Sequence, residues 1–113
     1  MIELEDAVME IIVNAGQSRS LCFEALHCAR NGNIDEARLL LNEADGYARR
    51  AHQMQTRLIE QDAGEARQPM TLIMVHAQDH LMNSLLAREF SEELINLCQR
   101  YFISIYSNCT RNK

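Results

Sequence analysis

The stretch Leu72–Leu97, LIMVHAQDHLMNSLLAREFSEELINL, decides the fold of this chain. On a helical wheel of about 100° per residue, its apolar residues form two stripes on opposite sides. The first stripe contains Leu72, Val75, Met82, Leu86, Phe90 and Leu97, and the second contains Ile73, Met74, Ala77, Leu81 and Leu85. A surface helix in a small monomer normally carries one apolar stripe. We therefore predict that this helix packs against its own chain on one side and against another subunit on the other, in a closed cyclic assembly.

Two earlier segments have the spacing of helices that pack along a single seam. Apolar or small residues recur there in steps that alternate between four and three, as in a coiled coil. The first seam continues through Gly16, so we predict one unbroken helix there although a glycine inside a helix is unfavourable. The first seam contains Leu4, Val8, Ile11, Ala15, Ser18, Cys22, Ala25 and Ala29, and the second contains Ile34, Ala37, Leu41, Ala44, Ala48, Ala51, Gln55 and Leu58.

Short signals mark the ends of these helices. Gly32 suits the left-handed residue that often ends a helix, and Asn33 followed by Glu36 looks like a capping box for the next helix. After a linker at residues 64–68, Pro69 suits a helix start, where its missing N–H is not needed. The sequence therefore predicts an all-α fold, an antiparallel three-helix bundle in a single domain. Within that domain, residues 1–113, helices are expected at about residues 2–31, 34–62 and 69–100, with a tail at residues 101–113.

The composition limits the function classes that the chain can serve. A net charge of −5 argues against a broad nucleic-acid surface, and no apolar run is long enough for a transmembrane helix. The acidic start, with Glu3, Glu5 and Asp6, does not fit a signal peptide. We therefore expect a cytoplasmic protein with no nucleic-acid partner and no direct membrane insertion. The four cysteines form no C-x-x-C pair and are expected to be reduced core residues for the most part.

Polar side chains interrupt the apolar stretch in its first half. On the wheel, His76 and His80 lie with Asn83 on a strip between the two stripes, and Asp79 falls inside the first stripe. Histidines four residues apart can bind one metal ion, but the local sequence offers no obvious third ligand. An accessible imidazole can also accept a phosphoryl group and pass it on. Because the chain has no glycine-rich phosphate loop, the phosphoryl donor would have to be another phosphoprotein.

Three functions remain open on these residues alone. The first is a phosphohistidine carrier, the second is a metal-binding helical oligomer with His76, Asp79 and His80 as ligands, and the third is a structural interaction bundle. For His27 and His52 we expect the ordinary role of a half-buried, hydrogen-bonded structural histidine.

The order of residues in three segments resembles a known family. MTLIMVHAQDHLMNSLLARE, residues 70–89, closely resembles the lactose/cellobiose-type enzyme IIA of the bacterial phosphoenolpyruvate-dependent sugar phosphotransferase system, and VHAQDHLM is specific to that family. NAGQSRSLCFEAL, residues 14–26, and QTRLIEQDAGEA, residues 55–66, look like its other shared segments. The resemblance covers roughly residues 3–97 and is at least as close to the cellobiose and chitobiose branch as to the lactose branch. The tail from Cys98 onward departs from it, being longer and more aromatic.

The resemblance implies a fold, an activity and partners. It implies a homotrimer of three-helix subunits in which His76 carries a phosphoryl group. The donor would be the phosphohistidine of the carrier protein HPr, and the acceptor a cysteine of enzyme IIB, during uptake of a disaccharide such as cellobiose, chitobiose or lactose. Asp79 would lie near the trimer axis, where three copies can share one Mg²⁺ or similar cation. His80 and Gln78 match the motif and would line the site, and no organic cofactor is expected.

Overall fold

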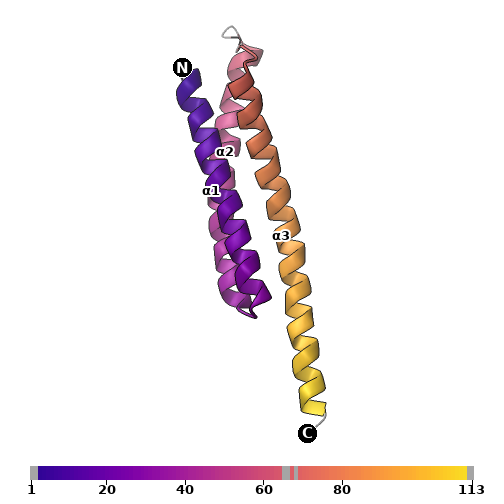
Figure 1. Ribbon diagram of the computed structural model, residues 1–113. Helices are drawn as coiled ribbons and strands as arrows, with labels where there is room; N and C mark the ends of the chain where they lie inside the picture. Colours follow the sequence, from indigo (N-terminus) through magenta and orange to yellow (C-terminus); the bar gives the residue numbers. More distant parts are fainter. Residues whose placement is uncertain (1–2, 65–66, 68, 112–113) are drawn as a thin grey trace.

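The chain folds into three long antiparallel helices, which run down, up and down again in Figure 1. The computed structural model describes residues 3–64, 67 and 69–111, and every regular element in that part of the chain is helical. The helices are α1 (Leu4–Arg30), α2 (Ile34–Ala63) and α3 (Leu72–Arg111). The predicted all-α fold with three helices is therefore confirmed. Met1, Ile2, Glu65, Ala66, Gln68, Asn112 and Lys113, which the predicted helix ends, linker and tail include, lie outside the described residues.

The turn between α1 and α2 depends on one glycine. Gly32 has a φ of +88°, a left-handed conformation that side chains other than glycine's rarely adopt. The backbone N–H groups of Gly32 and Asn33 donate to the carbonyls of Ala29 and Cys28, at 3.1 and 2.9 Å, which closes the end of α1. The predicted capping box is wrong, because Asn33 makes no side-chain cap at the start of α2.

The start of α3 also differs from the prediction. The helix begins at Leu72, not at Pro69, because Thr71 supplies the cap. The Oγ1 of Thr71 accepts a hydrogen bond from the backbone N–H of Met74 at 3.3 Å, as an N-cap side chain does. At the other end, α3 continues through the predicted tail as far as Arg111. Figure 1 shows this last part of α3 projecting past the turn that joins α1 and α2.

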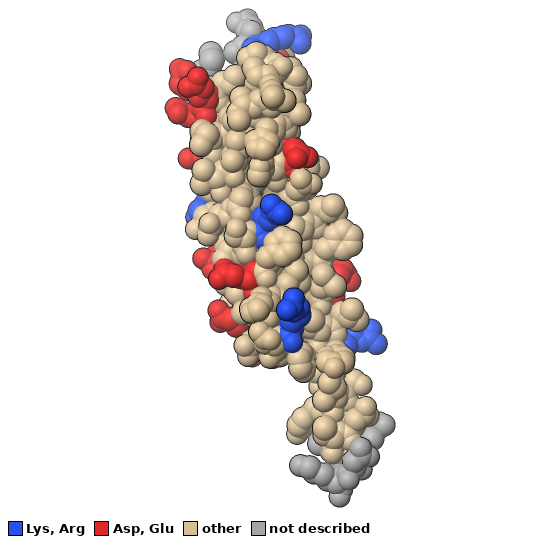
Figure 2. Space-filling model, in the orientation of Figure 1, with Lys and Arg blue, Asp and Glu red and all other residues tan. Residues whose placement is uncertain are grey.

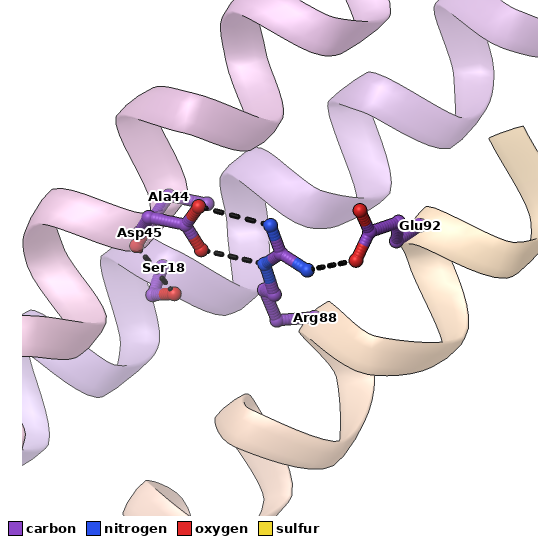
Figure 3. Close-up of polar contacts among 5 residues, drawn as sticks. All are labelled: Ser18, Ala44, Asp45, Arg88 and Glu92. Carbon is purple, nitrogen blue, oxygen red and sulfur yellow. Dashed lines mark hydrogen bonds and ion pairs between the residues drawn. The ribbon is translucent and has the colours of Figure 1, made fainter.

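The core is built mainly from alanine and other small or aliphatic side chains along the two predicted seams. α1 packs most extensively against α2, next against α3, and α2 and α3 touch least. The hydroxyl of buried Ser18 donates to the Ala44 carbonyl at 2.9 Å, which reflects how closely the small residues let α1 and α2 approach (Figure 3). On α3, Met74, Ala77 and Leu81 of the second stripe are buried, whereas Ile73 of the same stripe is half exposed in the single chain.

Arg88 of α3 connects this helix to α2, the pair of helices that make the least contact with each other. Arg88 on α3 donates from Nε and Nη2 to the two carboxylate oxygens of Asp45 on α2, at 2.6 and 3.0 Å, and also pairs with Glu92 one turn along α3 (Figure 3). Hydrogen bonding to Asp45 raises the pKa of the Arg88 guanidinium above its ordinary value. Such bidentate pairs fix geometry as well as adding stability, so Arg88 sets the position of α3 beside α2.

The first apolar stripe of α3 lies uncovered in the single chain. Leu72, Val75, Met82, Leu86, Phe90 and Leu97 are each between 49% and 85% exposed. They run along about half the length of a molecule that measures 71 × 20 × 17 Å. An exposed apolar patch of this length is typical of an interface. Within the described ranges, none of the helices combines the length and hydrophobicity that a bilayer span requires.

Candidate functional site

The two histidines of the apolar stretch face each other on α3. His76 Nε2 and His80 Nε2 lie 3.1 Å apart, and the ring centroids are 4.5 Å apart at an interplanar angle of 82°. One nitrogen of this pair must carry a proton and the other must accept it. The contact therefore fixes the orientation of both rings and couples their tautomers. His76 is exposed and His80 is half-buried, so an external reactant can reach the pair.

The histidine pair lies between two open hollows. One hollow, of about 640 Å³, lies on the side of α3 that carries the first apolar stripe. It is lined by Leu72, Ile73, Val75, His76 and Asp79. The other, of about 580 Å³, lies between α1 and α3, and we call it the α1–α3 groove. It is lined by Gly16, Arg19, Ser20, Phe23, Glu24, His27 and His80. The pair can therefore be approached from the stripe side and from the α1 side.

Asp79 lies on the exposed stripe, as the wheel predicts, and its carboxylate is exposed in the single chain. In the part of the chain that the structure describes, no three His, Cys, Asp or Glu side chains gather as a metal site. One subunit therefore offers Asp79 as a single carboxylate ligand. Carboxylate oxygens suit a hard divalent cation such as Mg²⁺, and a complete ligand set would have to come from several chains.

Gln78 is not brought to the histidines within one subunit. It lies on the opposite side of α3, where its Oε1 accepts a hydrogen bond from the Nε2 of Gln55 on α2. It lines a different hollow with Met74 and Leu58. The expected half-buried roles of His27 and His52 are wrong, because both side chains are exposed.

Two groove residues on α1 were not predicted as site residues. The sequence pattern marks Gly16 only as a residue that weakens a helix, and no motif in it marks Arg19. Both share with His80 the lining of the α1–α3 groove. Their spacing on α1 shows that they share a helix face, but only the packing of α1 on α3 shows that this face meets His80.

Cys22, the buried cysteine, carries no chemistry that competes with the histidine pair. All four cysteines are free, as expected, with Cys22 buried, Cys28 and Cys98 half-buried, and Cys109 exposed. Burial raises the pKa of the Cys22 thiol, which keeps it protonated and unreactive near neutral pH. The exposed imidazole of His76 is therefore the better nucleophile candidate: a second ring orients it, and hollows lie on both sides.

Comparison with known proteins decides the family. A profile described as the lactose/cellobiose-specific IIA subunit of the phosphotransferase system matches residues 6–99. The chain belongs to this family. As a member of it, the chain is a sugar-specific IIA component of the phosphotransferase system, and the predicted resemblance is confirmed. The matched region contains α1 from Asp6 onward, α2 and the first part of α3, and leaves out the projecting end of α3.

Relatives of this IIA chain support the assignment along most of its length. The N,N'-diacetylchitobiose-specific EIIA component of Escherichia coli is 47% identical over 98 residues, which cover 87% of this chain and 84% of the relative. The crystal structure of the cellobiose-specific enzyme IIA of Bacillus anthracis has a TM-score of 0.86 at 33% identity, covering 91% and 95% of the two chains. The Escherichia coli chitobiose IIA, solved in complex with HPr, has a TM-score of 0.78 at 44% identity, covering 89% and 98%.

Proposed function

We propose that this IIA chain is a phosphohistidine carrier that accepts a phosphoryl group on His76 from phospho-HPr. It then passes the group to a cysteine of its cognate enzyme IIB, in the cytoplasm, during uptake of a disaccharide such as cellobiose, chitobiose or lactose. The observation that carries the proposal is the exposed His76 imidazole, whose Nε2 lies 3.1 Å from that of His80. His80 orients the nucleophile and remains close to the incoming group.

The chemistry needs only groups that the chain and its partners supply. A lone pair of the His76 ring forms a bond to phosphorus while the bond from phosphorus to the donor imidazole breaks. The donor nitrogen keeps the electron pair of the broken bond. In the second step the IIB thiolate attacks phosphorus, and the His76 nitrogen leaves with its electron pair. Both steps are in-line displacements, in which positioning and charge stabilisation provide most of the catalysis.

Support for HPr as the donor comes from a related complex. The chitobiose IIA of Escherichia coli, which is 44% identical to this chain over the aligned region, was solved bound to HPr. HPr must reach the nucleophile for transfer, and the exposure of His76 meets that requirement. IIB must reach the same atom afterwards, so the two partners are expected to use overlapping surfaces in turn.

The exposed stripe of α3 supports assembly as a homotrimer. Three copies around an axis would cover the side chains of Leu72, Val75, Met82, Leu86, Phe90 and Leu97, which are open in the single chain. In a three-fold assembly each α3 presents one flank to one neighbour and the opposite flank to the other. Gln78 lies about 200° around the helix from His76. A trimer would therefore bring Gln78 toward the histidine pair of a neighbouring chain, where it would line the site.

The same assembly would bring three Asp79 carboxylates together. Each lies in the middle of the apolar stripe, so three copies near the axis would repel one another and lose hydration. A shared Mg²⁺ or similar hard cation, held by Asp79 from all three subunits, would neutralise them. The ion would supply structural charge balance at the axis, whereas the phosphoryl group would remain at the histidine pair.

The alternative is a metal-binding helical oligomer that uses His76, Asp79 and His80. The Nε2 atoms of the histidine pair are close enough to share one ion, which favours it. Against it, the described residues gather no third ligand at that place.

The experiment incubates the purified chain with labelled phosphoenolpyruvate, enzyme I and HPr. We expect acid-labile, base-stable label on wild type and none on His76→Gln, with His80→Ala labelled more slowly. Equal labelling of His76→Gln and wild type would contradict the assignment of His76. Stoichiometric zinc without label would support the metal-binding alternative.

A further inference from the structure

The α1–α3 groove has a glycine in its wall that the fold of the single chain does not require. A glycine inside a helix is unfavourable relative to alanine. A Cβ at Gly16 would meet no atom within 4 Å, so no packing in this chain demands its absence. Gly16 lines the groove beside His80. The bare backbone of α1 at this point therefore leaves room for a group that arrives from outside the chain.

Arg19 lies one helical turn further along α1, in the wall of the same groove. Its guanidinium carbon lies 5.7 Å from the centre of the Phe23 ring, a cation–π contact that restricts the side chain. Among the described residues, Arg19 makes neither an ion pair nor a side-chain hydrogen bond. Its donors are therefore available to an anion in the groove.

The charge distribution around the groove favours an anion on the α3 side. On the face shown in Figure 2, separate basic side chains lie near the middle of the molecule, with acidic side chains beside them. Glu24 also lines the groove, but at about 100° per residue it lies about 140° around α1 from Arg19. Arg19 shares its edge of α1 with Leu26, and Leu26 lines a neighbouring hollow together with Leu94 of α3. Arg19 is therefore the charged residue on the histidine side, and Glu24 lies on the far side.

We propose that the α1–α3 groove holds the phosphoryl group during its transfer to and from His76, which rests on the function proposed above. Arg19 and His80 bind the phosphoryl oxygens, and Gly16 provides the opening that admits the group. As the bond from phosphorus to the donor nitrogen breaks and the bond to His76 forms, negative charge is spread over three oxygens. A planar guanidinium matches two of those oxygens better than an ammonium does. Arg19 is thus a further functional residue of the transfer site, supplied by α1.

The test compares Arg19→Gln with the matched control Arg50→Gln. Arg50 is also exposed and lies over a ring, 4.9 Å from the centre of Tyr47, but it is on α2. Single-turnover transfer from phospho-HPr to the full chain is measured over a range of HPr concentrations. We expect Arg19→Gln to lower the maximal rate about 10- to 100-fold with little change in apparent KM. Arg19→Lys should recover part of the rate, Arg50→Gln should match wild type, and Gly16→Leu should slow transfer by filling the groove.

The outcomes separate this inference from the proposed function. A wild-type maximal rate in Arg19→Gln overturns the inference, as does a raised KM at an unchanged maximal rate, because Arg19 would then only dock the donor. Absence of label on the wild-type chain contradicts the carrier function itself. Circular dichroism and sedimentation accompany each variant. If Arg19→Gln alters the fold or the assembly, the other two variants decide. The inference is then overturned if Arg19→Lys and Gly16→Leu both transfer at the wild-type rate.

Discussion

At the scale of single residues, the histidine pair is the part of the site that the sequence could predict. His76 and His80 are four residues apart on one helix, so their contact follows from helix geometry alone. Gly16 and Arg19 are on another helix, and their approach to His80 depends on how α1 is positioned along α3. That position is set by the whole core, which no local pattern encodes. Gln78 shows the same limit, because its contact with Gln55 on α2 is tertiary.

The contact between Arg88 and Asp45 predicts a measurable loss of stability. Asp45→Ala would leave the guanidinium of Arg88, whose side chain is 25% exposed, without its bidentate partner on α2. We expect the free energy of unfolding to fall by about 1–2 kcal/mol, since charged hydrogen bonds of this kind are partly screened by water. Urea unfolding at a fixed chain concentration measures it. Glu43→Ala, an exposed acidic residue on the same helix, is the control and should change stability little; equal losses in both variants would refute the role of Asp45.

At the scale of elements, the seams of α1 and α2 were predictable because they repeat over many turns. Their buried positions, such as Val8, Ile11, Leu41 and Leu58, follow the predicted steps. The ends of the helices were predicted less well, because each cap depends on the backbone conformation of a single residue and does not repeat along the sequence. The side chain of Thr71, not the ring of Pro69, begins α3. The end of α3 was placed too early because aromatic and β-branched residues lower helix propensity, but no glycine or proline stops the helix.

The projecting end of α3 is tied to the bundle through Phe102. This ring lies over the turn between α1 and α2, where a Cβ on Gly32 would be 3.5 Å from its Cζ. Phe102→Ala should loosen this end of the helix, so amide hydrogens of residues 101–109 should exchange faster while those of α1 and α2 stay protected. Tyr106→Ala, at a side chain that is 72% exposed, is the control. Unchanged exchange in Phe102→Ala would mean that the tail is held by its own helical bonds.

At the scale of the whole molecule, the two apolar stripes on opposite sides of α3 lead us to predict that subunits assemble along the exposed first stripe. Leu86 lies in the middle of that stripe and is 52% exposed in the single chain. Leu86→Glu would place three carboxylates in an apolar interface, so sedimentation should show species smaller than a trimer at low micromolar concentration. Leu39→Glu, at a 63% exposed position on α2, is the control and should keep the wild-type size. A trimeric Leu86→Glu would show that the stripe is not the subunit contact.

The position of Asp79 in the exposed apolar stripe leads to a prediction of how assembly depends on a metal ion. Replacing a carboxylate in an apolar interface by an apolar residue of similar size is often neutral or stabilising. Asp79→Leu should therefore hold the trimer at least as well as wild type, and chelator should lower the melting temperature of wild type only. His76 is on a neighbouring strip of α3, so the variant should still accept phosphate. A trimer that dissociates in Asp79→Leu would mean that the carboxylate makes an essential hydrogen bond across the subunits.

The most direct test of the central claim is to locate the phosphoryl group and follow it onward. The wild-type chain is phosphorylated by enzyme I and HPr, purified, mapped by mass spectrometry under conditions that preserve phosphohistidine, and then mixed with the cognate enzyme IIB. We predict that the phosphoryl group is on His76 alone and that it moves to a cysteine of IIB without any further donor. A phosphoryl group on His80 or another residue, or one on His76 that IIB cannot remove, would contradict this account.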